Sequence, residues 1–139
     1  MITFLLVLID QVVKFFITTH YTVGTTTVLV PNMLNVTYVE NTGAAFSILS
    51  DNTYLIIILS LLVLFILYKY ILTADKYDYV KALLVGGIVS NLIDRVFRGC
   101  VIDYIEVLFK GVNVPIFNIA DICIVIGSIL FIFKTLEEK

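Results

Sequence analysis

The chain has 139 residues, of which 60% are hydrophobic and only 14% are charged, and its mean hydropathy is +1.07. A soluble domain of this length could not bury so much apolar surface, so the composition predicts an integral membrane protein with a single domain, residues 1–139. The net charge of −2 gives no basic surface for nucleic acid. Two cysteines and one histidine give no pattern typical of a disulfide framework or a zinc site.

Four apolar segments predict membrane-spanning helices, at residues 1–18, 54–72, 80–97 and 114–133. The segment at 54–72 is the clearest, because its only charge, Lys69, lies near its end. Between the first two segments, polar and apolar residues alternate from Leu34 to Glu40 with the period of a strand. The predicted fold class is therefore an all-α membrane protein with four transmembrane helices. We expect residues 20–50 to add a small β-structure on the outer membrane surface.

The distribution of basic residues predicts how the helices are oriented. Residues 15–52 contain no lysine or arginine. The link between the second and third segments and the C-terminus contain five lysines: Lys69, Lys76, Lys81, Lys134 and Lys139. Because cytoplasmic loops are enriched in basic residues, both termini are predicted to be cytoplasmic. Arg95, Arg98 and Lys110 then lie on the outer side against this trend, so another role is expected for them.

The first predicted helix carries two charges. Asp10 and Lys14 are four residues apart, so they share one helix face and are expected to form an ion pair. An isolated charge in the middle of a bilayer costs about 2.5–3.5 kcal/mol, and pairing recovers part of this cost. A lysine beside a carboxylate stays protonated, so a structural role for the pair is expected rather than a chemical one.

The third predicted helix contains a polar cluster in the stretch GGIVSNLIDR. Asn91, Asp94 and Arg95 have the spacing i, i+3 and i+4, which is typical of one helix face. Gly86 and Gly87 lie about one turn below and would allow a neighbouring helix to pack closely. Two interpretations stay open at this point, a polar cluster that only packs and a polar wall that orients a substrate.

Two aspartates are expected to meet near the outer interface. Asp103 follows the third segment, and Asp121 lies in the fourth, about 10 Å inside its outer end at 1.5 Å per residue. Gly111 and Pro115 can turn the chain between them. Asn118 precedes Asp121 by three residues and is expected to donate a hydrogen bond to its carboxylate.

The pair of aspartates predicts a specific chemistry. Two carboxylates in a site of low dielectric constant cannot both ionise, so one holds a proton while the other can activate a water. Aspartic peptide hydrolysis needs this arrangement and neither a metal nor a cofactor. A Ser-His-Asp triad fits less well, because the only histidine, His20, lies in the outer segment. A serine–lysine dyad also fits less well, because Ser90 and Lys81 lie toward opposite ends of one helix. Taken alone, Asp103 could also be a helix cap or a packing partner.

Two further functions stay open on the residues alone. A small carrier would use the aspartates to bind protons or cations, with Asp10 and Lys14 as a gate, although no inverted repeat typical of transporters is visible. A purely structural membrane protein would tolerate the substitution Asp121→Leu. Ion flux without peptide cleavage would favour the carrier.

Five motifs, in this order, resemble the bacterial lipoprotein signal peptidase (signal peptidase II) family: DQVVKFF, ENTGAAFS, GGIVSNLIDRVFRG, VIDYIEV and FNIADICIVIG. The resemblance extends from Asp10 to about Gly127. It implies a four-helix aspartyl endopeptidase of the bacterial cytoplasmic (inner) membrane, with a β-cradle and an active site toward the extracytoplasmic side. The implied substrates are prolipoproteins whose lipobox cysteine carries diacylglycerol, and the implied cut falls just before that cysteine.

The resemblance also implies roles for particular residues. The catalytic pair falls on Asp103 and Asp121, and Asn41 and Arg95 are expected to contact substrate. The implied substrate-binding residues are Asn41, Gly43, Asn91, Asp94, Arg95 and Asn118. Further family positions fall on Asp10, Lys14, Ala45, Gly87 and Ala120. Expected partners are membrane lipid and, in the same cleft as the substrate, cyclic peptide inhibitors of the globomycin type.

Overall fold

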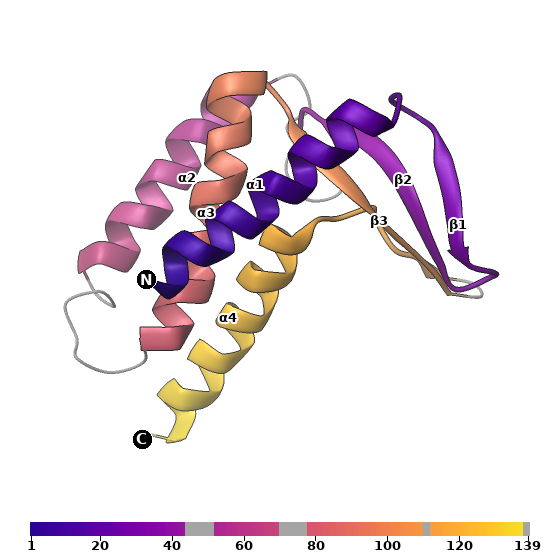
Figure 1. Ribbon diagram of the computed structural model, residues 1–139. Helices are drawn as coiled ribbons and strands as arrows, with labels where there is room; N and C mark the ends of the chain where they lie inside the picture. Colours follow the sequence, from indigo (N-terminus) through magenta and orange to yellow (C-terminus); the bar gives the residue numbers. More distant parts are fainter. Residues whose placement is uncertain (44–51, 70–77, 110–111, 138–139) are drawn as a thin grey trace.

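The computed structural model describes residues 1–43, 52–69, 78–109 and 112–137. Its helices are α1 (Ile2–His20), α2 (Thr53–Leu67), α3 (Asp78–Arg98) and α4 (Ile119–Glu137). Its strands are β1 (Thr26–Val30), β2 (Leu34–Asn41), β3 (Val101–Phe109) and β4 (Val112–Asn113). The helices lie together, and the sheet projects from one end of them, whereas both chain termini lie away from the sheet (Figure 1).

Helix α3 is the centre of the helical layer, because it packs against α1, α2 and α4. Its contact with α4 is very close at Gly87. A Cβ atom at this position would lie 2.5 Å from the Ala120 carbonyl oxygen and 2.7 Å from Cγ1 of Ile124. Gly127 of α4 is equally restricted, since a Cβ there would lie 2.9 Å from Cγ of Leu84. Gly87, which was predicted to allow close packing, and Gly127, which was not, therefore let the two backbones approach, whereas Gly86 faces Leu6 of α1.

The sheet is antiparallel, with the strand order β1-β2-β3-β4. The predicted strand from Leu34 to Glu40 is present as β2. Residues 44–50 of the predicted β-segment lie outside the described residues. Strand β3 was not predicted from the sequence; it pairs with β2 and places Val39 opposite Asp103. Asp103 is thus part of a sheet and does not simply follow a helix.

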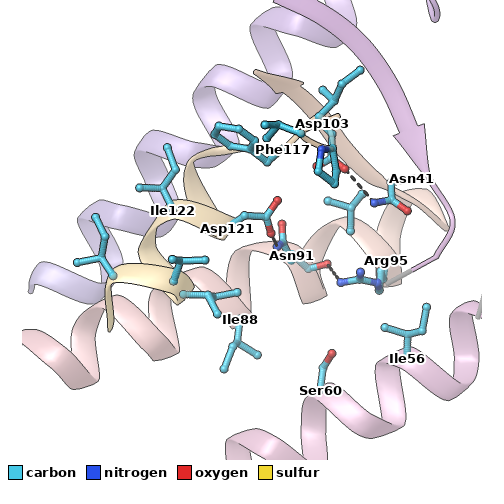
Figure 2. A pocket seen from close by; sticks show the side chains of 17 residues that line it. Asn41, Ile56, Ser60, Ile88, Asn91, Arg95, Asp103, Phe117, Asp121 and Ile122 are labelled. Atoms are coloured by element: carbon cyan, nitrogen blue, oxygen red, sulfur yellow. Dashed lines mark hydrogen bonds between the residues drawn. The ribbon is translucent and has the colours of Figure 1, made fainter. Parts of the chain in front are cut away.

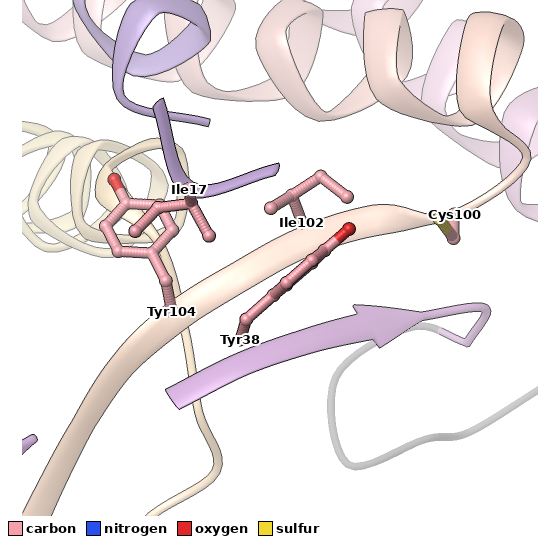
Figure 3. Close-up of a cluster of buried hydrophobic side chains, with 5 residues drawn as sticks. All are labelled: Ile17, Tyr38, Cys100, Ile102 and Tyr104. Carbon is pink, nitrogen blue, oxygen red and sulfur yellow. The ribbon is translucent and has the colours of Figure 1, made fainter. Parts of the chain in front are cut away.

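A small apolar core joins α1 to this sheet (Figure 3). Its members are Ile17, Tyr38, Cys100, Ile102 and Tyr104. Ile102 and Tyr104 both lie in this core, and successive side chains of a strand point to opposite faces. Asp103 is therefore directed to the other face of β3, toward the space between the helices.

The fourth helix begins later than the sequence predicts. Residues 114–118 are not helical, and Phe117 instead forms a bridge with Ile105, whose N–H donates to the Phe117 carbonyl at 2.8 Å. Asn118 then caps the helix, which starts at Ile119. Asp121 consequently lies in the first turn of α4, and the predicted depth of about 10 Å inside the helix is wrong.

Within the described residues, α1 and α4 are long and apolar enough to cross a membrane. Helix α2 is equally apolar but has 15 residues, and residues 70–72 of the predicted second segment lie outside the described part of the chain. All three helices expose large apolar side chains, for example Phe15 (65%), Phe65 (62%) and Phe133 (62%). Exposed apolar faces of this extent are typical of contact with lipid.

We predict that Gly87→Ala destabilises the protein by about 1–3 kcal/mol, because the added methyl group meets the backbone of α4 and the first turn of that helix must move. The matched control is Gly86→Ala, where the nearest atom to the new Cβ is a side-chain carbon of Leu6 at 3.2 Å. Thermal unfolding in detergent measures both changes. Equal midpoints for the two variants would contradict the close packing of α3 on α4.

Candidate active site

A cavity of about 640 Å³ lies between α2, α3, α4 and the helix-facing ends of β2 and β3. Its polar lining comprises Asn41, Ser60, Asn91, Arg95, Asp103 and Asp121 (Figure 2). The rest of the wall is apolar and includes Ile56, Ile88, Phe117 and Ile122. Across the described ranges, no three His, Cys, Asp or Glu side chains are grouped to hold a metal ion.

Both predicted aspartates converge on this cavity and accept hydrogen bonds from the same residue. Asn118 donates from Nδ2 to Oδ1 of Asp103 at 2.7 Å and from its backbone N–H to Oδ2 of Asp121 at 3.2 Å. Each carboxylate has a second amide donor on its other oxygen. Asn41 donates to Asp103 at 2.9 Å, and Asn91 donates to Asp121 at 2.8 Å. Four amide donors thus fix the two carboxyl groups beside each other.

The position of Asp121 follows from the way α4 begins. Its backbone N–H donates to Oδ1 of Asn118 at 2.9 Å, and its carboxylate accepts from the N–H of Asn118, so the two residues form a capping box. The N–H of Ala120 donates to Oδ1 of Asp10 at 3.0 Å, and that of Ile119 to the Tyr104 hydroxyl at 3.4 Å. The capped N-terminus also favours a negative charge in the first turn.

Asp103 is buried, with 2% of its surface exposed. Burial penalises the charged form and raises the pKa of Asp103 to about 6, and the negative charge of Asp121 acts in the same direction. The hydrogen bonds from Asn41 and Asn118 oppose this shift, because they stabilise the charged form. A carboxyl group with this pKa can hold or release a proton near neutral pH.

A buried lysine connects α1 to the site. Lys14 Nζ lies 2.8 Å from Oδ2 of Asp10, so the ion pair predicted from the sequence is present, and it lies 2.7 Å from Oδ2 of Asp94. The ammonium also donates to Oδ1 of Asn91 at 2.8 Å. Because the amide oxygen of Asn91 is held by Lys14, its nitrogen is turned toward Asp121. Lys14 therefore orients one of the four donors.

Asp94 does not line the cavity, although a substrate contact was predicted for it. It is fully buried and pairs with Lys14 and Arg98, and it accepts further hydrogen bonds from Gln11 and from the backbone of Ile102. The geometry of α3 explains the difference. At 3.6 residues per turn, positions 94 and 95 differ by about 100° around the helix, so Arg95 faces the cavity and Asp94 faces α1.

Two further residues that were predicted to contact substrate, Asn118 and Gly43, do not line the cavity. Asn118 is fully buried and is covered by the two carboxylates that it holds. Gly43 accepts a hydrogen bond from Arg95 at 3.1 Å through its carbonyl, and its N–H donates to the side chain of Asn41 at 3.0 Å. Both residues shape the site without lining it. Ala45, implied by the resemblance, lies outside the described residues.

The Arg95 guanidinium is only partly satisfied by the protein. It donates to the carbonyls of Gly43 at 3.1 Å and Asn91 at 3.4 Å. Its Nε atom is buried and has no acceptor among the described residues. Since a guanidinium carries five N–H groups and the described residues accept from two of them, the remaining Nη hydrogens are the ones that can bind another molecule.

Sequence reasoning missed some of the polar residues around the site. Ser60 lines the cavity from α2, and Ser90 donates to Oδ2 of Asp10 at 2.6 Å. Gln11 donates to Ser90 and Asp94 from the face of α1 that meets α3. A usable signal existed for Ser60, because it is the only polar residue between Leu55 and Leu67.

The fold is shared with solved structures of two bacterial membrane enzymes, determined by the in meso method at 2.3 and 1.9 Å resolution. The first has a TM-score of 0.89 and 35% sequence identity and covers 99% of this chain and 86% of the other. The second has a TM-score of 0.86 and 35% identity and covers 99% and 92%. The fold and the site together define a membrane enzyme.

The sequence comparisons identify the family. The family model for signal peptidase (SPase) II matches residues 2–137. The lipoprotein signal peptidase of Thermodesulfovibrio yellowstonii is 36% identical over 137 residues, which cover 97% of this chain and 92% of that protein. The chain belongs to the signal peptidase II family, the membrane proteases that remove signal peptides from prolipoproteins. The resemblance stated from the five motifs is confirmed.

We predict that Lys14→Met destabilises the protein by about 3–5 kcal/mol, because two buried carboxylates, Asp10 and Asp94, lose their shared cation. Adding Asp10→Asn to this variant removes the carboxylate that, among the described residues, pairs with Lys14 alone, and should recover part of the loss, whereas Asp94 keeps its ion pair with Arg98. Denaturation in detergent compares the single and double variants. A Lys14→Met protein as stable as the parent would contradict the role of this lysine in joining α1 to α3.

Proposed function

We propose that this protease is an aspartic endopeptidase and that Asp103 and Asp121 are its catalytic residues. The observation that carries the proposal is the pair of hydrogen bonds from Asn118, which links the two carboxylates at the wall of one cavity. Two carboxyl groups held in this way share one proton, since ionising both in a buried site is unfavourable. The pair can then act as acid and base in one reaction.

The ionised member of the pair takes a proton from a water, whose oxygen attacks the scissile carbonyl carbon. The protonated member donates to the carbonyl oxygen, and a tetrahedral intermediate forms. When the C–N bond breaks, the member that took the water's proton donates it to the leaving amine. The other member takes a proton from a hydroxyl of the intermediate as the carbonyl is restored. Asp103 suits the donor role because burial raises its pKa to about 6, so it keeps its proton to higher pH than an exposed aspartate does.

The other polar residues of the cavity suit substrate binding. Arg95 has Nη hydrogens that no described residue accepts and that can bind peptide carbonyl groups, and Asn41 and Asn91 lie on either side of the dyad. The apolar part of the wall suits a substrate whose cysteine carries diacylglycerol. The cleavage point is then the bond just before that cysteine. A cyclic peptide of the globomycin type would occupy the same cavity and exclude the substrate.

We also propose that the chain forms one domain in the bacterial cytoplasmic membrane. All four helices cross the bilayer, both termini are cytoplasmic and the sheet lies on the extracytoplasmic side. The distribution of lysines supports this orientation. Asp121 in the first turn of α4 and Asp103 in β3 then lie close to the outer interface. A lipid-anchored substrate would deliver its scissile bond at that depth.

We predict that Asp103→Asn and Asp121→Asn each lower cleavage of a diacylglyceryl-modified precursor by about 10²–10⁴-fold, because each variant removes one acid–base group. Asp78→Asn is the matched control, since this carboxylate is exposed (86%) on α3 and pairs only loosely with Lys81, at 3.4 Å. Gel-based turnover by purified protein in detergent measures all three variants.

If either dyad variant retained the parent's turnover while Asp78→Asn did the same, the aspartic mechanism would be refuted. Inhibition of the parent by a lipobox-mimicking cyclic peptide provides a second readout. The folded state of each variant is checked by its unfolding midpoint.

We predict that Asn41→Ala moves the alkaline limb of the pH profile of kcat/KM to higher pH. The amide of Asn41 stabilises the charged form of Asp103 and so lowers its pKa. Without this donor the pKa rises above about 6, and the proton is retained to higher pH. A limb that stays in place, or moves to lower pH, would contradict the assignment of this limb to Asp103.

A further inference from the structure

The end of the sheet that is farthest from the helices is apolar and exposed. This sheet tip comprises residues 28–33, 108, 109 and 112. The exposed fractions of its side chains include 58% for Val28, 55% for Leu29, 63% for Met33 and 66% for Phe109. Apolar surface gathered in this way marks a site of contact with a protein or a membrane.

The tip forms one surface across three strands. The turn between β1 and β2 is joined to β3 by a hydrogen bond from the Leu108 N–H to the Met33 carbonyl at 2.9 Å. Val28, Leu29 and Val30 are all exposed although they are consecutive. Since alternate residues of a strand point to opposite faces, neither face of the hairpin end is covered by the described protein. Residues 26–34 and 107–109 contain no charged side chain, and Lys110 is the next residue in the sequence.

The exposed middle of the sheet is polar, so the exposed apolar side chains of the sheet are confined to the tip. Glu106 accepts hydrogen bonds from Asn35 at 2.8 Å and Thr37 at 2.6 Å, and Thr37 is bonded to Thr26 at 2.9 Å. A protein strand paired with the edge of β1 would run along both the polar middle and the apolar tip, so it does not explain why the two differ. A boundary between water and lipid matches the change from polar to apolar along the sheet.

The arrangement of the chain favours lipid as the partner. The sheet leaves the ends of α1 and α3 sideways, beyond the helices, and does not continue along their axes (Figure 1). The outward faces of the helices are apolar and face the bilayer of this membrane protease. A sheet that projects sideways at the membrane surface lies over the lipid that surrounds the helices.

We propose that the sheet tip inserts into the interfacial region of the bilayer and is a lipid-binding surface of this protein. The inserted side chains are Val28, Leu29, Met33, Leu108 and Phe109. Contact with lipid removes their apolar surface from water, which favours insertion. Because β3 runs from the tip to Asp103, the anchored tip fixes the sheet at a set depth relative to the helices.

The chain contains no tryptophan, so a single introduced tryptophan reports its own surroundings. We compare Met33→Trp and Phe109→Trp with two controls in phosphatidylglycerol–phosphatidylcholine vesicles. Thr22→Trp is an exposed position near the end of α1, at the other end of the β1–β2 hairpin. Phe65→Trp lies on the exposed apolar face of α2. Phospholipids with brominated acyl chains quench tryptophans in the bilayer, and iodide quenches those in water.

We expect brominated lipid to quench the tip positions and Phe65→Trp, and iodide to quench Thr22→Trp. The tip tryptophans should also emit at shorter wavelength than Thr22→Trp. Quenching of the tip positions by iodide alone would overturn the proposal. Protection from both quenchers that disappears when the protein is diluted in lipid would also overturn it, because a second copy of the chain would then cover the tip.

Discussion

The site depends on one residue, Asn118, which holds two carboxylates that would otherwise repel each other. Its backbone N–H and its amide nitrogen are directed to different aspartates, so the separation of Asp103 from Asp121 is set by the geometry of a single residue. The same side chain caps α4. The start of the helix and the geometry of the acid–base pair are therefore one structural feature, and a shift of either would disturb the other.

The buried ion pairs of Lys14 support the start of α4 and the two aspartates from the side of α1. Asp10 reaches from α1 to a free N–H in the first turn of α4, while Lys14 links the same carboxylate to Asp94 of α3. Charges are costly in a membrane protein unless they are paired, and here each one also connects two elements. The close contact at Gly87 brings α4 near enough to α3 for Asn91 to donate to Asp121.

Much of the site could be predicted from the sequence because charges are rare in it. Asp10, Lys14, Asp103 and Asp121 are conspicuous in apolar surroundings, and the first pair has helical spacing. The strand β3 could not be identified, because its partner β2 lies about sixty residues earlier and only tertiary pairing distinguishes it from a helix end. The late start of α4 was missed for a similar reason, since the bridge to β3 keeps the preceding residues extended.

The central claim is that the two aspartates share one proton, and difference infrared spectroscopy with isotopically labelled aspartate tests it directly. A protonated carboxyl group has a distinct C=O stretch, so the band can be followed as the pH is raised. The account predicts one such band in the parent protein that is lost near pH 6, and its absence or displacement in both Asp103→Asn and Asp121→Asn. A band that stays unchanged in either variant would contradict the shared proton.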